Sequence, residues 1–240
     1  ARIARVVTIH DLVWKHAGET MRPISRWLDA TLMPEAVRLA DRIITVSSHT
    51  ATDLLREMPN AQGKVRSIPL GVSSLALAAP RESLASLGLF EPYFLFVGTL
   101  EPRKNLDRLL EAFSRLPDNL RYSTVMAIAG GRGWGGEDVS TIVKKYGLQD
   151  RVRVLGYVSE EQLATLYTHA LFLAMPSLYE GFGLPLIEAM SRGIPVLTSN
   201  CASMPEVVGD AGILVAPNDV DAIAKGLSEL LCNTSQRSVL

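Results

Sequence analysis

Residues 177–193 read Ser-Leu-Tyr-Glu-Gly-Phe-Gly-Leu-Pro-Leu-Ile-Glu-Ala-Met-Ser-Arg-Gly. The apolar run 170–175 before them predicts a strand, Gly181 and Gly183 interrupt regular structure, and Pro185 suits the first turn of a helix. A helix N-terminus offers unpaired N–H groups and the positive end of the helix dipole, and glycines let a phosphate approach the backbone. The stretch therefore predicts a strand, a phosphate-binding loop and a helix over 186–192.

Two carboxylates, Glu180 and Glu188, flank this loop. Because the loop bends the chain back, a phosphate bound in it would have one carboxylate on either side. Each carboxylate can accept paired hydrogen bonds from sugar hydroxyls, so the arrangement suits a sugar nucleotide. The spacing alone leaves an alternative open, in which Glu180 is a solvated loop acid and Glu188 is favoured by the helix dipole.

The composition indicates an ordinary globular protein. The chain has 240 residues, of which 48% are apolar and 20% charged, and its net charge is −1. It can bury one large or two small cores, and it lacks the basic excess of a nucleic-acid-binding protein. Its apolar runs stop short of the roughly 18 residues that a bilayer span needs. Cys201 and Cys232 have no metal-ligand spacing, which favours a reducing compartment.

The first part of the chain predicts an incomplete sheet domain. Strands are expected over 5–9, 43–46 and 64–72, with a helix over 24–40 that breaks or kinks at Pro34. Ser47 or Ser48 can cap a second helix that runs to about Met58. Three strands with two helical crossovers are about half of a doubly wound domain, which commonly has six strands.

The rest of the chain predicts a complete domain of the same type. Short apolar strands alternate with helices, which indicates a parallel sheet covered on both faces, and Ser159 with Gln162 forms a capping box at one helix start. The fold class is thus α/β, with a partial N-terminal Rossmann-like domain over 1–75 and a complete Rossmann-type domain over 86–240. A linker over 76–85 joins them, and the low-charge stretch 73–80, which overlaps its start, is the expected hinge. The expected strands are 93–97, 124–129, 151–155, 170–174, 195–198 and 213–215, and the expected helices are 81–87, 106–116, 138–146, 160–168, 186–192, 204–208 and 219–231.

The segment Glu-Gly-Phe-Gly-Leu-Pro-Leu-Ile-Glu-Ala-Met at 180–190 resembles the Glu-x7-Glu signature of the retaining family-4 glycosyltransferases of GT-B architecture. The similarity extends to Phe-Val-Gly-Thr-Leu-Glu-Pro-Arg-Lys-Asn at 96–105, to 195–200, to 205–212 and to Thr-Ile-His-Asp at 8–11. It implies two Rossmann-like domains, of which the N-terminal one holds the acceptor and is entered part-way by this chain. We expect either a fragment or a naturally short enzyme that completes its sheet by dimerising.

The resemblance also implies roles for residues of the donor cleft. Lys104 would contact the donor diphosphate, and Arg103 would supply a second charge because Thr99 stands where the family usually has an arginine after Gly98. The alternative for Arg103 and Lys104 is a basic pair on a solvated loop. Glu180 would bind the donor sugar and Glu188 the ribose. The other residues expected to contact substrate in the cleft are Gly98, Thr99, Phe182, Gly183, Leu184, Gly131, Tyr157 and Val158.

The glycines at 131–136 match G-x-G-x-x-G, a dinucleotide-binding pattern. The pattern requires an acid at the end of the following strand, but that strand ends in the sequence Val-Leu-Gly-Tyr at 154–157. We therefore interpret Gly130 and Gly131 as lining the donor cleft and Trp134 as packing.

Several polar residues have two interpretations. His10 would donate to the sugar or the diphosphate, as the resemblance implies, and Asp11 would be structural. His16, His49 and His169 lack metal-ligand spacing, and the helix dipole equally well explains Glu206. Tyr157 and Val158 would lie near the nucleotide base, although a tyrosine at a strand end is more often structural.

Departure of a diphosphate leaves negative charge, which Lys104, Arg103 and the amides of Gly183 and Leu184 can neutralise without a metal or other cofactor. The resemblance implies retention, with attack on the face that the diphosphate leaves and a phosphate oxygen accepting the proton. Glu180, Lys104, Arg103 and His10 are therefore the catalytic candidates.

Residues 98–105 together with Gly131-Arg-Gly-Trp134 resemble bacterial mannosyltransferases of polysaccharide and O-antigen assembly. GDP-mannose is the first expectation for the donor, a UDP-sugar the second, and the acceptor would be a glycan or a lipid-linked glycan. We expect a cytoplasmic protein, with contact to the inner face of the membrane and homo-oligomerisation left open. Two alternatives are a module that binds nucleotide sugars without turnover and an NAD-dependent dehydrogenase, which needs the absent ribose acid.

Overall fold

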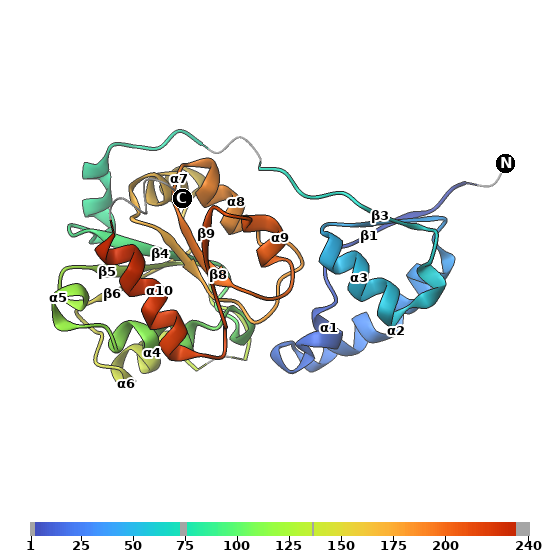
Figure 1. Cartoon of the computed structure of the whole chain (residues 1–240), viewed down its shortest axis with the longest axis horizontal. Coiled ribbons are helices and arrows are strands. Elements are labelled where there is room, and N and C mark those ends of the chain that lie inside the picture. Colours follow the sequence, from blue (N-terminus) through green and yellow to red (C-terminus); the bar gives the residue numbers. More distant parts are fainter. Residues whose placement is uncertain (1–2, 73–75, 136, 234–240) are drawn as a thin grey trace.

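The computed structural model describes residues 3–72, 76–135 and 137–233, which form two α/β units (Figure 1). The N-terminal unit has a parallel sheet in the order β1-β2-β3, made of Val6–Ile9, Arg42–Thr45 and Val65–Ser67. All three predicted strands exist, but β3 is shorter than the predicted 64–72. The amide of Ile68 still bonds to Thr45, whereas Pro69 has no N–H to continue the ladder.

Three helices pack on this sheet: α1 (Val13–His16), α2 (Pro23–Leu39) and α3 (Ser48–Glu57), with 3-10 turns at Gly18–Thr20 and Pro59–Ala61. Of the break or kink predicted at Pro34, the break is wrong, because α2 runs through Pro34 as one helix. Ala30, whose carbonyl loses its partner there, is exposed, so water can replace the missing N–H. Ser47 is the cap of α3 and accepts the amide of Thr50.

The C-terminal unit has a six-stranded parallel sheet in the order β6-β5-β4-β7-β8-β9. From β4 the chain adds β5 and β6 on one side, and it then returns to add β7, β8 and β9 on the other side of β4. This is a doubly wound sheet, and its switch point, where such sheets bind ligands, lies between β4 and β7. All six predicted strands are confirmed. β7 starts later than predicted because Ala170 still caps α7 through its amide. The strands are β4 Tyr93–Val97, β5 Val125–Ala129, β6 Val152–Gly156, β7 Leu173–Met175, β8 Val196–Ser199 and β9 Gly212–Val215.

Helices cover both faces of this sheet, as predicted. One buried cluster joins the sheet to α4, α6 and α10, and the other joins it to α7, α8 and α9. The predicted capping box of Ser159 and Gln162 opens α7, and the short helix α5 was not predicted. The helices are α4 Leu106–Ser114, α5 Asp118–Arg121, α6 Val139–Lys145, α7 Glu160–His169, α8 Leu184–Ser191, α9 Met204–Val208 and α10 Val220–Cys232, with 3-10 turns at Arg81–Leu87 and Pro102–Lys104.

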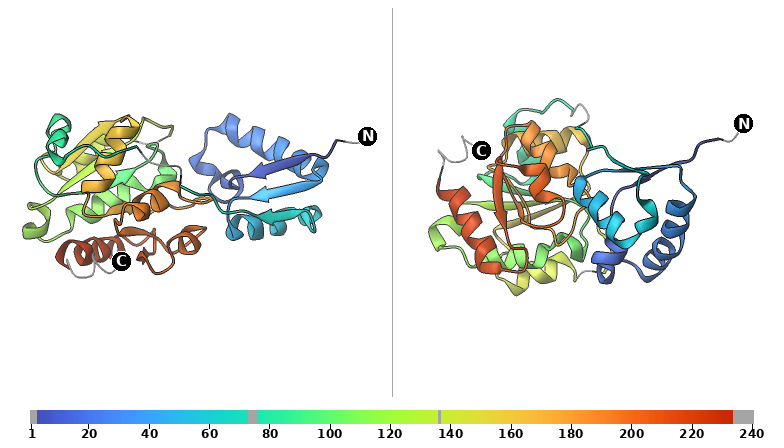
Figure 2. Two further views of the ribbon diagram at one scale, coloured as in Figure 1. Left: turned by 90° about the horizontal axis from the view of Figure 1, so that it is seen from above. Right: turned by 45° about the vertical axis from the view of Figure 1, so that its right-hand side comes forward.

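The two units lie side by side, and the left view of Figure 2 shows each of them clearly. Part of the predicted hinge, 73–75, lies outside the described residues, as do Gly136 of the glycine pattern and the end of the predicted second domain, 234–240. Within the described part of the chain, no helix combines the length and apolar character needed to cross a bilayer.

Candidate active site

The loop after β7 contacts both units. Gly183 adopts a left-handed backbone, with φ 96°, as the cap of α8, and Pro185 stands in the first turn, so α8 begins two residues before the prediction. A Cβ on Gly181 would lie 1.9 Å from the carbonyl oxygen of His10 at the end of β1. Only glycine allows this approach, so the loop is fitted against the N-terminal unit as well as against its own helix.

A buried ion cluster occupies the switch point between β4 and β7. Lys104 Nζ lies 2.7 Å from Glu180 Oε1, and Arg103 Nη1 lies 2.6 Å from Glu180 Oε2. Glu180 is 6% exposed and Lys104 is 8% exposed, so the two solvated-loop alternatives are wrong for these residues. Burial raises the pKa of Glu180, but attraction by Lys104 and Arg103 and their hydrogen bonds outweigh it and hold the pKa below its ordinary value.

Two loops bring these charges together. The amide of Leu178 donates to the carbonyl of Arg103 at 2.8 Å, which ties the loop after β7 to the loop after β4. Asn105 has a left-handed backbone, with φ 61°, and its side-chain amide donates to the carbonyls of Pro176 and Pro217. Asn105 therefore fixes three loops at once, a role that sequence reasoning missed.

Close backbone packing also explains why glycine stands at positions 98 and 130, which are adjacent in space. A Cβ on Gly130 would lie 1.9 Å from the carbonyl oxygen of Gly98, and the side chain of Lys104 passes 3.3 Å from the Cβ position of Gly98. The glycines thus let the loops after β4 and β5 come together beside the ion cluster.

Glu188 faces a partner on a neighbouring helix. The hydroxyl of Tyr167, on α7, donates to Glu188 Oε2 at 2.8 Å. Burial raises the pKa of Tyr167 well above its ordinary value, and the carboxylate raises it further. This bond orients the side chain of Glu188, which is half-buried. An acid that only favours the helix dipole would not need such a partner. Tyr167 was missed because only the packing of α7 on α8 brings it to this carboxylate.

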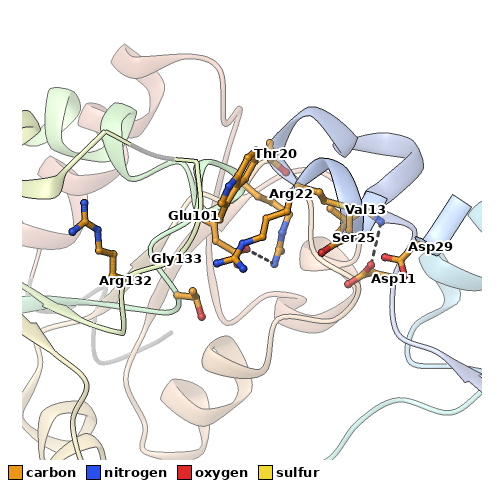
Figure 3. A pocket seen from close by; sticks show the side chains of 13 residues that line it. Asp11, Val13, Thr20, Arg22, Ser25, Asp29, Glu101, Arg132 and Gly133 are labelled. Atoms are coloured by element: carbon orange, nitrogen blue, oxygen red, sulfur yellow. Dashed lines mark hydrogen bonds and ion pairs between the residues drawn. The ribbon is translucent and has the colours of Figure 1, made fainter. Parts of the chain in front are cut away.

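A cavity of about 500 Å³ opens between the two units beside the ion cluster (Figure 3). Thr99 and Arg103 line it, as predicted for the cleft, and so does Trp134, which had been interpreted only as packing. Asp11 accepts the amide of Val13, which fits its structural interpretation, but it also lines the cavity. The other lining residues are Val13, Thr20, Met21, Arg22, Ser25 and Asp29 of the N-terminal unit and Glu101, Arg132 and Gly133 of the C-terminal unit.

Asp29 stands beside Asp11 on the N-terminal side of the cavity (Figure 3). Burial raises the pKa of Asp29 above its ordinary value, and the nearby charge of Asp11 raises it further. Both units contribute charges of both signs to the cavity: the N-terminal unit supplies Asp11, Asp29 and Arg22, and the C-terminal unit supplies Arg103, Arg132 and Glu101. No local sequence signal predicts this arrangement.

The remaining predicted contacts lie around this centre. Leu184 is half-exposed at the start of α8, Phe182 is buried in the loop, and His10 is exposed at the end of β1. The carbonyl of Gly131 accepts the amide of Leu100. Tyr157 is 88% exposed, and Val158 packs against the core beneath α7.

The histidines and Glu206 have roles that the sequence did not indicate. His16 and His49 both approach Asp53, and the carboxylate of Glu206 accepts the amides of Ser48 and His49 at 2.9 and 3.1 Å, so Glu206 caps α3 of the other unit. In the ranges that the structure covers, no group of three or more His, Cys, Asp or Glu side chains could hold a metal ion.

Comparison with known proteins identifies the family. The model of the family described as "Glycosyl transferases group 1" matches residues 85–240, and that of "Glycosyltransferase Family 4" matches residues 1–74. The sucrose-phosphate synthase of Thermosynechococcus elongatus has a TM-score of 0.80 and 28% identity over 97% of this chain and 60% of that structure. HepE from Anabaena, solved with UDP-glucose, has a TM-score of 0.80 at 21% identity, over 98% of this chain and 64% of its own, and supports the fold alone.

Two curated relatives are mannosyltransferases. The Escherichia coli O-antigen chain mannosyltransferase B is 38% identical over 98% of this chain and 63% of its own length. An MMP alpha-(1->4)-mannosyltransferase from Mycolicibacterium hassiacum is 32% identical over 87% of this chain and 50% of its own. The chain thus spans between half and two thirds of these relatives. With a group 1 match over most of its length and the doubly wound sheet described above, it belongs to the GT-B glycosyltransferases of group 1 and family 4.

Proposed function

We propose that the chain binds a nucleoside diphosphate sugar and transfers the hexose, with retention of configuration, to an acceptor hydroxyl. The observation that carries this proposal is the buried cluster of Glu180, Lys104 and Arg103 at the switch point of the sheet. The N-terminus of α8 lies beside it, and its amides at Gly183 and Leu184 favour an anion.

The proposed roles follow from charge and position. Lys104, Arg103 and the two amides neutralise the departing diphosphate, so no metal is required. Glu180 accepts donor-sugar hydroxyls, and Glu188, oriented by Tyr167, accepts the ribose hydroxyls. The bond from the anomeric carbon to the diphosphate breaks, the acceptor oxygen bonds to that carbon on the same face, and its proton moves to a phosphate oxygen. His10, which follows β1, is proposed to donate to the sugar or the diphosphate across the cleft.

The mannosyltransferase relatives support mannose as the transferred sugar, and GDP-mannose is the donor that we propose for it. A UDP-sugar is the second candidate, because the similar fold of HepE was solved with UDP-glucose. We propose a glycan acceptor and a cytoplasmic location, at the inner face of the membrane where the glycan is lipid-linked.

Titration calorimetry with GDP, UDP, ADP and GDP-mannose in a chelating buffer tests this function, followed by an assay for hydrolysis of whichever donor binds. We expect selective binding of GDP and GDP-mannose without metal, and slow hydrolysis of GDP-mannose. Binding that requires added magnesium would contradict the electrostatic mechanism. Binding without hydrolysis would favour the alternative that the chain is a module that binds nucleotide sugars and does not turn them over. No binding at all would overturn the proposed donor site.

Asp29 offers a test on the acceptor side of the cavity. We expect Asp29→Asn to weaken binding of methyl α-mannoside, used as the acceptor probe, by about tenfold, because a hydrogen bond to a charged group contributes roughly 1.5–3 kcal/mol. Transfer from GDP-mannose measured against probe concentration gives the change in KM. Glu35→Gln, on the same helix but paired with Arg38 on the exposed side, is the matched control. Equal KM values for both variants would remove Asp29 from the acceptor site.

A further inference from the structure

Residues on both sides of Glu180 are held by the N-terminal unit. The hydroxyl of Tyr179, which precedes Glu180, donates to Asp53 Oδ2 on α3 at 2.9 Å. The carbonyl of Gly181, which follows Glu180, accepts the hydroxyl of Thr50 on the same helix at 3.2 Å. Glu180 itself points to Lys104 and Arg103 of the C-terminal unit. The backbone around Glu180 is thus held by the N-terminal unit, while the Glu180 carboxylate pairs with cations of the C-terminal unit.

Asp53 is a buried centre of polar contacts, with only 2% of its surface exposed. Its Oδ1 lies 2.7 Å from Arg56 Nη2, and its Oδ2 lies 3.0 Å from His49 Nε2 and 3.6 Å from His16 Nε2. Among these partners Tyr179 alone comes from the C-terminal unit. Because a buried carboxylate is costly without its partners, Asp53 and Tyr179 stabilise each other across the junction.

The ring of Tyr179 is enclosed as well. It is 6% exposed, stacks on His16 with ring centroids 5.5 Å apart, and meets His49 edge-on at 6.1 Å. Val13 and Ala17 of the N-terminal unit pack on it in one small hydrophobic cluster. The ring therefore has its pocket in the N-terminal unit, although its backbone belongs to the loop of the other.

A second contact fixes the same end of α3. Glu206, at the start of α9, accepts the amides of Ser48 and His49. Ser203, just before α9, donates its hydroxyl to the carbonyls of Glu180 and Phe182. Separation of the units would break the bonds of Tyr179, Gly181 and Glu206 to α3 together, so the loop conformation seen here depends on their contact.

We infer that Asp53 is a positioning residue that acts through Tyr179 to place the Glu180 carboxylate for the donor sugar. The inference rests on the proposed function of Glu180 but adds a residue of the N-terminal unit to the donor site. The ion cluster then has its working geometry only when α3 contacts the loop, so the two units act together on a donor that the C-terminal unit binds.

Tyr179→Phe tests the inference, because it removes only the hydroxyl and keeps the ring against His16. Asp53→Asn is the second variant, and Arg56→Gln is the matched control, since it removes a bond to the other oxygen of Asp53 within the N-terminal unit. Amide hydrogen exchange by mass spectrometry and hydrolysis of GDP-mannose are the readouts, with circular dichroism to confirm that each variant folds.

We expect both Tyr179→Phe and Asp53→Asn to speed exchange in residues 177–183 and in the first turn of α3, while Arg56→Gln leaves the loop unchanged. The rate of hydrolysis should fall about ten- to one-hundredfold, as expected for loss of one hydrogen bond to a charged group. GDP affinity should change less than twofold, and the double variant should lose no more than the larger single loss, because the two residues act as one unit.

Unchanged exchange in 177–183 in both folded variants would overturn the inference, as would losses that add in the double variant. An effect of Arg56→Gln equal to that of Asp53→Asn would indicate that only α3 itself was destabilised. Failure of the proposed function is distinguished by the unaltered chain, which would then bind no nucleoside diphosphate, whereas the exchange result concerns the loop whether or not the donor binds.

Discussion

Lys104→Ala is expected to lower affinity for GDP about one hundredfold while leaving affinity for guanosine unchanged. Lys104 would contribute a charge-assisted contact of roughly 1.5–3 kcal/mol to the diphosphate. Its removal also leaves the buried Glu180 with Arg103 as its remaining close cation, so more of the negative charge of Glu180 faces the incoming phosphates. The two effects act in the same direction, which is why the loss should reach the upper end of the range for one contact.

Guanosine makes the test specific, because it carries the base and the ribose without phosphate. Calorimetry of both ligands separates a local loss at the diphosphate from a general disturbance of the cleft. Lys145→Ala is the control, since Lys145 is a half-exposed lysine of the same unit that pairs with Asp107 at 3.3 Å. Equal losses for GDP and guanosine, or no loss for either, would contradict the placement of the diphosphate at Lys104.

The sequence predicted those parts of the fold that depend on local patterns. Six short apolar runs between turn signals located the six strands of the C-terminal sheet, and the Ser159–Gln162 box located the start of α7. The errors arose where context overrides a local rule. Pro34 does not break an exposed helix, and Pro69 ends β3 although the apolar pattern continues beyond it.

Long-range pairing could not be predicted from spacing. The sequence located Glu180, Lys104 and Arg103 at the site but gave them separate tasks, whereas the folded chain joins them in one ion cluster. Tyr167 reaches Glu188 and Asp53 reaches Tyr179 only after helices have packed, so neither pair has a sequence signature. Trp134 was assigned to packing because the cavity that it lines exists only between the two units.

The ion cluster makes stability depend on pH. The pKa of Glu180 is lowered in the folded chain, so the carboxylate is ionised at neutral pH and its stabilising effect is fully present above the unfolded pKa. That effect is lost as the pH falls through the lowered folded value. The same pairing means that Lys104 and Arg103 are already engaged with a carboxylate before any diphosphate arrives.

Glu180→Gln should therefore separate binding from catalysis. Without the carboxylate, Lys104 and Arg103 lose the charge that competes with phosphate for them, so GDP should bind more tightly, by about tenfold. Hydrolysis of GDP-mannose should nevertheless fall about one hundredfold, because the amide cannot replace a charged acceptor to the donor-sugar hydroxyls. Thermal unfolding should show a loss of stability of about 3–5 kcal/mol, the cost of leaving buried cations without their partner.

Glu101→Gln is the graded control for this variant. The Glu101 carboxylate lies 3.7 Å from Arg103 and is more exposed than that of Glu180, whereas the Lys104 ammonium pairs with Glu180. Loss of the Glu101 charge therefore acts on the same arginine without freeing the buried lysine, and the backbone bond from the Lys104 amide to the Glu101 carbonyl remains. It should increase GDP affinity less and lower stability less than Glu180→Gln. Weaker GDP binding by Glu180→Gln at unchanged stability would show that the carboxylate does not compete with the diphosphate. A general loss of structure would lower both the affinity for GDP and the rate of GDP-mannose hydrolysis. Tighter GDP binding together with slower hydrolysis therefore indicates a specific role of the Glu180 carboxylate.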